Sequence, residues 1–316
     1  MSKLKQLRTP SVYIMAFVLL LLAVMPTFVE SFYIFLLTRI LFMGLAAMSL
    51  YVLMGLGGML SFAQMGFFGI TAYSIGITAT KLSWPFGLSV VFGLVMVLVV
   101  TAVFALIAIR TKGNYFLMIT LAFGQMLYLA ALQWVELTGG FSGTTAIPVW
   151  SFASDRNLLY YFVLAVVLVC YIFLKRMINS PFGTALQGVR DNPQKMAAMG
   201  FNVQLVRYVA ILLSSLLAGL AGTLSVMFYT MISPNTLVMA NSIVILFMVL
   251  VGGSKKLEGA LLGSLIYLVM QDFVSQWTPR YQIIIGVFFI LVVLFLPKGF
   301  LGLSFHRKKS RLKEAR

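Results

Sequence analysis

Residues able to make or break covalent bonds are scarce in this chain. Its 316 residues include one cysteine, one histidine and seven acidic residues. Cys170 lies in an apolar run and His306 in a basic tail, so the sequence supplies too few residues for a histidine-based catalytic triad or a cysteine–histidine zinc site. A nucleotide-binding loop of the form G-x-x-x-x-G-K-[ST] is also missing from the sequence. We therefore expect no catalytic residue, no metal site and no cofactor on this chain.

Polar side chains inside long apolar runs indicate the passage of a polar solute instead. Helices that cross a membrane place such groups where a substrate passes, or use them for hydrogen bonds to neighbouring helices. The candidates for a translocation pathway are Gln64, Tyr73, Asn114, Thr120 and Gln125. The sequence is compatible with both uses.

Three charged residues in or near apolar runs form a second group of candidates. Arg39 lies within a run, whereas Glu136 and Asp272 lie near the outer ends of two others. A charge within the bilayer is costly, so it must reach towards water, pair with an opposite charge or bind substrate. We expect a structural ion pair between Arg39 and one of the two acids.

The elements that must position these residues are membrane helices. Apolar residues make up 61% of the chain and charged residues only 9%, with a mean hydropathy of +1.04. Soluble domains carry about 25% charged residues, so the composition excludes a soluble enzyme, a disordered chain and a secreted disulfide scaffold. The net charge of +16 falls in short clusters between apolar runs. This pattern is typical of a chain surrounded by membrane lipid and argues against a nucleic-acid partner.

Ten apolar runs are long enough, or nearly so, to cross a hydrocarbon core about 30 Å thick. We predict an all-α integral membrane protein, a polytopic bundle of about ten transmembrane helices. One run contains Arg39, one is rich in glycine and polar residues, and one is short, so eight or nine full spans is the alternative. No A-x-A-like cleavage site follows the first run, which indicates a retained helix. The predicted spans are 12–29, 32–54, 59–80, 86–109, 115–135, 158–174, 208–231, 238–251, 260–276 and 281–296.

Lysine and arginine are distributed unequally on the two sides of these spans. With the N-terminus inside, 19 of the 23 lie in inner segments, three lie in outer segments and Arg39 lies within a span. By the positive-inside rule, both termini are cytoplasmic. The predicted organisation is a cytoplasmic N-terminus (1–11), one transmembrane domain (12–303) that includes a cytoplasmic loop (175–207), and a basic cytoplasmic tail (304–316).

The cytoplasmic loop 175–207 is the longest polar segment and has the sequence of two short helices. Ser180 can cap a first helix that begins at Pro181, and Asn192 a second that begins at Pro193 and ends before Gly200. Such a pair is too polar to enter the membrane and lies at its surface. It is either a solvated connector or, because small residues alternate with charges, a surface that docks into a groove of another protein.

Rows of small residues predict close helix packing. Ser214, Ala218 and Gly222 recur at steps of four, as do Gly259 and Gly263. Small residues let helix backbones approach closely. We interpret these rows, and the GLGG segment at 55–58, as packing features and not as transport groups.

The segment GTALQGVRDNPQKMAAMG (183–200) resembles the cytoplasmic coupling loop of branched-chain amino acid ABC importer permeases. Five other segments resemble motifs of that family, and their order and spacing fit the M-type subunit better than the H-type subunit. They are GNYFLMITLAFGQ (113–125), TGGFSGTTAIP (138–148), LLAGLAGTL (216–224), VGGSKKLEGALLGS (251–264) and LPKGFLG (296–302). The resemblance extends over residues 44–302.

This resemblance implies a type II-like ABC importer permease in a bacterial or archaeal cytoplasmic membrane. The implied partners are a homologous H-type permease, two ATPase subunits that hold ATP and Mg, and an extracytoplasmic substrate-binding protein. The residues expected to couple the chain to the ATPase are Gly183, Arg190, Asp191, Asn192, Ala197 and Gly200. Arg190 and Asp191 either contact the ATPase or form a local pair that caps the turn.

Departures from the family pattern bear on the substrate. Asn114 and Gln125 stand where the family has acidic residues, and Thr184 replaces the first arginine of the coupling motif. The implied substrate is a branched-chain or related amino acid, and an ABC permease for urea or short-chain amides is the alternative. From another class, an ion-gradient-driven secondary transporter would need an acid in mid-membrane, and a membrane enzyme would need clustered catalytic residues. We find neither pattern in the sequence.

Overall fold

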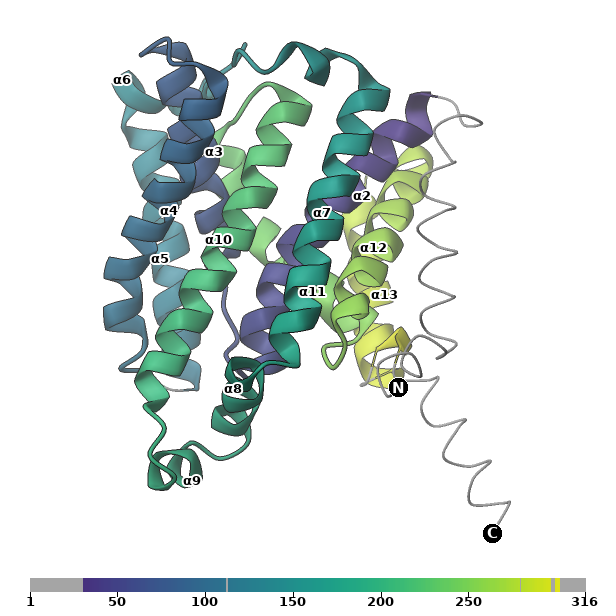
Figure 1. Ribbon diagram of the computed structural model, residues 1–316. Coiled ribbons are helices and arrows are strands. Elements are labelled where there is room, and N and C mark those ends of the chain that lie inside the picture. The colour runs from purple at the N-terminus through teal and green to yellow at the C-terminus, as the bar shows by residue number, and fades with distance from the viewer. Residues whose placement is uncertain (1–30, 112, 279, 297–298, 302–316) are drawn as a thin grey trace, which may run out of the picture.

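The computed structural model describes residues 31–111, 113–278, 280–296 and 299–301. The expected N-terminal segment (1–11), first span (12–29) and basic tail (304–316) lie outside the described residues. Within those ranges, six helices are long and apolar enough to cross a membrane, which confirms a polytopic helical membrane protein (Figure 1). They are α2 (Ser31–Tyr51, prolonged by the π-helix η2, Val52–Leu56), α4 (Phe86–Ala108), α5 (Asn114–Gln133), α7 (Arg156–Ile178), α10 (Val203–Tyr229) and α12 (Leu257–Trp277).

Three shorter helices correspond to the other predicted spans among the described residues, two of which (59–80 and 238–251) the sequence marks as irregular; the third irregular run, 32–54, is a full-length helix. These helices are α3 (Gln64–Thr80), α11 (Met239–Gly252) and α13 (Tyr281–Phe295). The span expected at 59–80 begins late because residues 59–63 are not helical. The helix before it ends at two glycines, and Gly58 has a φ of +64°, which glycine adopts without steric cost. The other described spans match their predicted ranges to within a few residues at each end.

Two helices form the centre of the bundle. The most apolar stretch of α2, continued through η2, is 83% buried and that of α10 is 72% buried, against 28% for α4 and 22% for α5. The small-residue row on α10 explains the close packing at the centre. A Cβ atom added at Gly222 would lie 2.4 Å from the carbonyl oxygen of Phe68 on α3, so only glycine fits. Ser214 and Ala218 are fully buried on the same row.

Helices α11 and α12 form a hairpin that is held together by glycine. A Cβ atom at Gly252 would lie 1.7 Å from the carbonyl oxygen of Gly259, and one at Gly263 would lie 1.6 Å from that of Met248. Side chains at these positions would separate the two backbones. The row of Gly259 and Gly263 therefore permits the close approach that the sequence predicts.

The two ends of the bundle differ in structure. At one end, α8 (Pro181–Asp191) and α9 (Pro193–Ala198) project beyond the membrane helices (Figure 1). At the other end lie α6 (Val135–Thr138) and the short 3-10 turns η3 (Gly140–Ser142) and η4 (Ser151–Ser154). The outer loop is tied to the chain after α10 by an isolated antiparallel bridge. Thr144 and Ile232 exchange backbone hydrogen bonds of 2.8 and 2.9 Å.

The described lysine and arginine residues are distributed unequally between these two ends of the bundle. Those assigned to the end that carries α8 and α9 are Arg110, Lys175, Arg176, Arg190, Lys195, Arg207, Lys255 and Lys256. Lys81, Arg156 and Arg280 belong to the opposite segments. The end with α8 and α9 is therefore the cytoplasmic end by the positive-inside rule.

Candidate functional site

Local capping interactions shape the cytoplasmic helix pair α8–α9. The Ser180 Oγ accepts a hydrogen bond of 3.3 Å from the Gly183 N–H, and Pro181 occupies the first turn of α8. The Asn192 Oδ1 accepts a bond of 2.9 Å from the Lys195 N–H at the start of α9. These caps satisfy amide groups that a helix N-terminus otherwise leaves without a partner. Both caps confirm the helix starts that the Ser-Pro and Asn-Pro pairs predict.

One face of α8 is seated against the membrane helices. Ala185, Leu186 and Val189 are buried on this face. Gly183 is also buried, and a Cβ atom there would lie 2.3 Å from the carbonyl oxygen of Met177 at the end of α7. Gly183 is thus required for the sharp junction between α7 and α8. Its side of the helix is not available to a partner protein.

The opposite surface of the helix pair is exposed. Asp191, Asn192, Lys195 and Ala197 are solvent-exposed, and Ala197 adds a small residue to the charged face. Met199 and Phe201 expose 57% and 45% of their surface at the end of α9. This surface is the part of the helix pair that stays available to a partner protein.

Arg190 connects α8 to the interior of the bundle. Its terminal Nη1 donates a hydrogen bond of 2.7 Å to the carbonyl oxygen of Gly55 in η2, and its Nε donates one of 2.9 Å to Asp191. A Cβ atom at Gly58 would lie 2.5 Å from the Arg190 Cγ, so the side chain crosses directly over this glycine. The Arg190–Asp191 pair is local. The hydrogen bond to Gly55 instead reaches η2, which ends the central helix α2.

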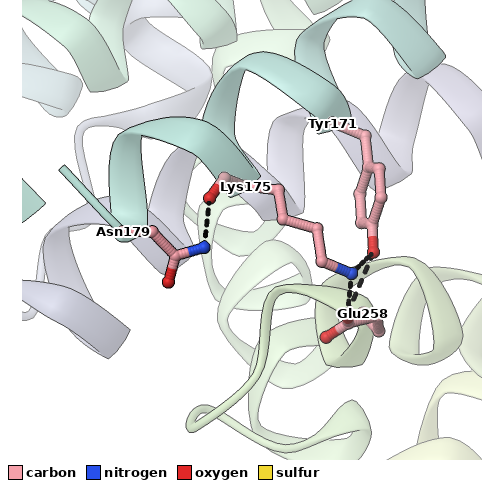
Figure 2. A network of polar contacts seen from close by, with 4 residues as sticks. All are labelled: Tyr171, Lys175, Asn179 and Glu258. Atoms are coloured by element: carbon pink, nitrogen blue, oxygen red, sulfur yellow. Dashed lines mark hydrogen bonds and ion pairs between the residues drawn. The ribbon is translucent and has the colours of Figure 1, made fainter. Parts of the chain in front are cut away.

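A second polar contact fixes α7, the helix that leads into α8, to α12. Figure 2 shows the Lys175 ammonium between the Tyr171 hydroxyl and the Glu258 carboxylate. Lys175 lies 2.9 Å from the Tyr171 oxygen and 3.0 Å from a Glu258 oxygen, and Tyr171 donates a bond of 2.9 Å to the same carboxylate. Asn179 donates to the Lys175 carbonyl oxygen one turn later. Helix α8 is therefore held at both of its ends, through α7 before it and through Arg190 in its last turn.

Glu258 is a site residue that the sequence analysis missed. Its signal was present, since an acid follows two lysines at the first turn of an apolar run. An acid there is favoured by the helix dipole of α12. Its pairing with Lys175 depends on how α7 and α12 pack, which composition and spacing do not specify.

We predict a modest coupling energy between Lys175 and Glu258. Both side chains are about two-fifths exposed, and solvent screening limits pairs of this kind to about 0.5–1 kcal/mol. Unfolding of Lys175→Met, Glu258→Gln and the double variant, followed in detergent micelles, gives the coupling energy from a double-mutant cycle. A coupling near zero would show that the pair contributes nothing to the attachment of α7.

The interruption between η2 and α3 is the other notable feature of the described core. Residues 59–63 run without helical structure, and side chains of two neighbouring helices bond to backbone amides in and just after this segment. The Phe62 N–H donates 3.1 Å to the Thr120 Oγ1 of α5, and the Met65 N–H donates 3.3 Å to the Ser242 Oγ of α11. Non-helical backbone at membrane depth is tolerated where protein or a water-filled cavity surrounds it.

Gln64 begins α3 at this interruption and is fully buried. The Ser49 Oγ donates 2.9 Å to its Oε1, and its Nε2 donates 3.2 Å to the Ser214 Oγ. The Ser214 hydroxyl in turn donates 2.7 Å to the carbonyl oxygen of Ser49. This network joins α2, α3 and α10 at the centre of the bundle.

The five pathway candidates do not form one cluster. Gln64 and Thr120 both contact the segment around the interruption, and Tyr73 is buried farther along α3. Asn114 is exposed at the start of α5, and Gln125 is partly exposed in its middle. A substrate role for any of the five stays a prediction.

Replacing Gln64 with methionine distinguishes packing from substrate contact. The loss of two interhelical hydrogen bonds costs about 1–2 kcal/mol of stability at the roughly 0.6 kcal/mol found for each such bond in membrane proteins, plus the cost of the unpaired serines. We expect a lower thermal midpoint in detergent and unchanged selectivity among substrates. A changed order of substrate preference with an unchanged midpoint would assign Gln64 to the pathway.

Arg39 has its partner on another helix. Its Nη1 lies 3.2 Å from the Asp272 carboxylate, and its Nη2 lies 3.4 Å from the Gln271 amide oxygen. Asp272 is therefore the acid that pairs with Arg39. Glu136 has a different role, because its backbone carbonyl accepts a hydrogen bond from the Lys81 ammonium. The Arg39–Asp272 pair joins α2 to the outer half of α12.

Comparison with known proteins places these features in a family. The family model described as the permease component of the branched-chain amino acid transport system matches residues 32–296. The chain is 24% identical over 223 residues to the high-affinity branched-chain amino acid transport permease protein LivM of Escherichia coli K12, covering 62% of this chain and 52% of that protein. It is 24% identical over 230 residues to the probable branched-chain amino acid transport permease protein LivM of Methanocaldococcus jannaschii, with 67% of each chain covered.

A further relative carries a different printed substrate. The tyrosine transport system permease protein of Clostridioides difficile is 25% identical over 185 residues, which cover 54% of this chain and 61% of that protein. No solved structure matches the chain. The match to the Escherichia coli protein spans about half of that protein's length. The family model nevertheless covers most of the present chain, including α2 to α13 almost completely, and the chain is a multi-pass membrane protein of the branched-chain amino acid transport permease family.

Proposed function

We propose that this chain is a membrane permease subunit of an ATP-binding-cassette importer, and that it forms part of the translocation pathway for branched-chain or related amino acids. ATP and Mg bind to two separate ATPase subunits in this proposal, and this chain holds no cofactor. The other partners are a homologous H-type permease and an extracytoplasmic substrate-binding protein. The observation that carries the proposal is the capped helix pair α8–α9, which projects from the cytoplasmic end and is joined to the central helix through Arg190.

The attachment of α8 supports a mechanical role for the helix pair. Arg190 bonds to Gly55, which lies a few residues before the non-helical segment 59–63. The same segment is held by a hydrogen bond from Phe62 to Thr120 of α5 and leads into Gln64 of α3. Movement of α8 by an ATPase subunit therefore acts directly on the point where the central helix is interrupted. An ATPase that favours one position of α8 shifts the equilibrium between two states of the membrane domain.

Within the proposal, the coupling residues have two kinds of role. Asp191, Ala197 and the exposed tip of α9 contact the ATPase subunit, while Gly183 and Arg190 position the helix pair against the bundle. Asn192 preserves the shape of the pair by capping α9. Gly200 has a φ of +87° and no atom within 4 Å of a Cβ added there, so it lets the chain leave α9 towards α10.

Reconstitution of the whole assembly tests the proposal. Proteoliposomes containing this chain, its partner permease and the ATPase subunits are supplied with the binding protein and radiolabelled leucine. We expect uptake that requires both ATP and the binding protein. Liposomes containing this chain alone should show no uptake under a proton or sodium gradient. Gradient-driven uptake by the chain alone would overturn the proposal and favour a secondary transporter.

The substrate is best assigned on the binding protein. Competition among leucine, isoleucine, valine, tyrosine, urea and acetamide for that protein identifies the transported class. We expect an aliphatic amino acid to bind most tightly. Preferential binding of urea or acetamide would retain the importer mechanism and replace the substrate.

A further inference from the structure

One stripe of helix α3 consists of three glycines and a tyrosine. Gly66, Gly69, Tyr73 and Gly76 recur at steps of three and four, so they lie on the same side of the helix. We call these four positions the α3 seam. At the three glycines no side chain separates the helix backbone from its neighbours. Tyr73 is therefore the one member of the seam that can make a polar side-chain contact.

Two outer segments cover the outer half of the α3 seam. A Cβ atom added at Gly69 would lie 2.5 Å from the side chain of Leu237, the last residue of the 3-10 turn η5 (Pro234–Leu237). A Cβ atom added at Gly76 would lie 3.3–3.5 Å from three side chains, which belong to Ile147, Ile232 and Thr144. We call the two covering segments, 139–148 and 230–238, the outer lid. It lies at the end of the bundle opposite α8 and α9 (Figure 1).

The outer lid is bonded within itself but not to α3. The bridge between Thr144 and Ile232 joins its two segments, and the Ile147 N–H adds a hydrogen bond of 3.0 Å to the Thr230 carbonyl oxygen. Among the described residues, no hydrogen bond joins the outer lid to α3. The lid can therefore separate from the α3 seam as one unit, at the cost of apolar contacts alone.

The hydroxyl of Tyr73 is buried without a partner. Tyr73 is only 6% exposed, and no described residue forms a hydrogen bond with its oxygen. Buried tyrosine hydroxyls usually have a partner. The hydroxyls of Ser89 and Thr101 on α4 are also unpartnered, but they are short and can turn to a carbonyl oxygen of their own helix. The Tyr73 hydroxyl stands at the far end of a ring and cannot reach the backbone of α3.

The direction of Tyr73 connects the outer lid to the interruption at 59–63. Side chains on a helix lean towards its N-terminus, so Tyr73 leans from beneath the lid towards Gly69 and Gly66. It lies nine residues after Gln64, which is about 14 Å along the helix at 1.5 Å per residue. The α3 seam thus runs from the outer end of the bundle to the point where α3 begins.

We propose that the α3 seam is the outer part of the substrate pathway, that the outer lid closes it, and that the Tyr73 hydroxyl donates a hydrogen bond to the carboxylate of the transported amino acid once the lid has opened. This inference rests on the proposed function and names a substrate contact within it. A carboxylate is a strong hydrogen-bond acceptor, and apolar surroundings strengthen the bond. The substrate supplies the partner that the hydroxyl lacks in the closed state.

Tyr73→Phe tests the substrate contact, because it removes the hydroxyl and keeps the ring. Uptake of radiolabelled leucine is measured in proteoliposomes that contain the whole assembly, with the binding protein saturated. We expect the uptake rate to fall about tenfold, as for loss of a hydrogen bond to a charged group. The thermal midpoint in detergent should not fall, since the hydroxyl has no described partner to lose. Tyr160→Phe is the matched control, a fully buried tyrosine on α7 outside the seam, and should leave uptake unchanged.

A disulfide between the α3 seam and the outer lid tests the opening. A Cβ atom added at Gly76 would lie 3.5 Å from the Thr144 Cβ, and disulfides join Cβ atoms about 3.5–4.5 Å apart. Gly76→Cys and Thr144→Cys are combined with Cys170→Ser in the full chain. We expect oxidation to lower uptake at least tenfold and a reductant to restore it. The reduced form is the reference, because Thr144→Cys also removes a hydrogen bond within the outer loop. Oxidation of the single Gly76→Cys variant should have no effect.

The outcomes separate this inference from the proposed function. An unmodified assembly that takes up no leucine would refute the proposed function. If the unmodified assembly transports leucine, normal uptake by Tyr73→Phe would overturn the substrate contact, and so would a lower midpoint with normal uptake, which would make the hydroxyl structural. Uptake that persists in the oxidised double variant would show that the outer lid does not open from α3.

Discussion

Arg190→Ala will lower the rate of substrate uptake by the proposed importer about tenfold or more, while ATP hydrolysis by the proposed ATPase subunits continues. The variant loses the 2.7 Å hydrogen bond from the guanidinium to the Gly55 carbonyl oxygen and the packing of its side chain over Gly58. Hydrogen bonds that involve a charged group contribute about 1.5–3 kcal/mol, and about 1.4 kcal/mol corresponds to a factor of ten. In the proposed importer the helix pair of the variant would still bind the ATPase but would no longer act on the end of α2–η2.

The measurement is the ratio of molecules transported to ATP hydrolysed in proteoliposomes. Arg176→Ala is the matched control, because Arg176 lies in the last turn of α7 and has no hydrogen-bond partner among the described residues. Arg190→Lys should be intermediate, since an ammonium group keeps the charge but cannot bond to Gly55 and Asp191 with a planar fork. An Arg190→Ala complex with a normal ratio would show that this contact does not transmit movement.

Gly263→Ala will prevent the hairpin of α11 and α12 from closing. The added Cβ atom would lie 1.6 Å from the carbonyl oxygen of Met248 and 3.1 Å from the Gly252 nitrogen. Both are backbone atoms, so relief requires a whole helix to move. Overpacking of a tight core typically costs about 1–3 kcal/mol and sometimes more, and we expect the upper end of this range or misfolding. The test is the thermal midpoint and the recovery of monodisperse protein in detergent.

Gly286→Ala is the paired control for this experiment. Gly286 lies within α13, and a Cβ atom added there meets no atom within 4 Å. The same chemical change at this position should leave the thermal midpoint unchanged or slightly raised, because alanine favours a helix by about 1 kcal/mol over glycine. If both variants had similar midpoints, the close backbone contact of the hairpin would not be required for stability.

The amino-acid sequence predicts the membrane helices well because their signal is local. Apolar length determined the spans, and the Ser-Pro and Asn-Pro pairs located the starts of α8 and α9. Glycine spacing indicated where backbones meet. For the interruption at 59–63, the sequence indicated only that the run 59–80 is irregular. Its position depends on the backbone turn at Gly58, where φ is positive.

The polar network was harder to predict because it joins distant parts of the chain. Gln64 was selected as a pathway residue on the grounds that it is polar within an apolar run, and its two partners come from α2 and α10. Arg190 was expected to contact either Asp191 or another protein, and its bond to Gly55 spans 135 residues of sequence. Pairings of this kind follow from helix packing, which the hydrophobic pattern of one chain does not determine.

The backbone bridge between Thr144 and Ile232 holds the outer loop in place without using side chains, so exposed side chains of this loop can vary. The two residues are joined through their backbones, and Ile147 adds a third backbone bond to Thr230. Main-chain bonds do not depend on side-chain identity, so exposed positions such as Thr145 are free to change without loosening the loop. The exceptions include Gly139 and Gly143, where a Cβ atom would lie 2.1 Å from the carbonyl oxygens of Gly143 and Ile232, respectively. The outer loop thus has a fixed backbone on which exposed side chains can change, while the buried Thr138 and Thr144, whose hydroxyls bond within the loop, cannot.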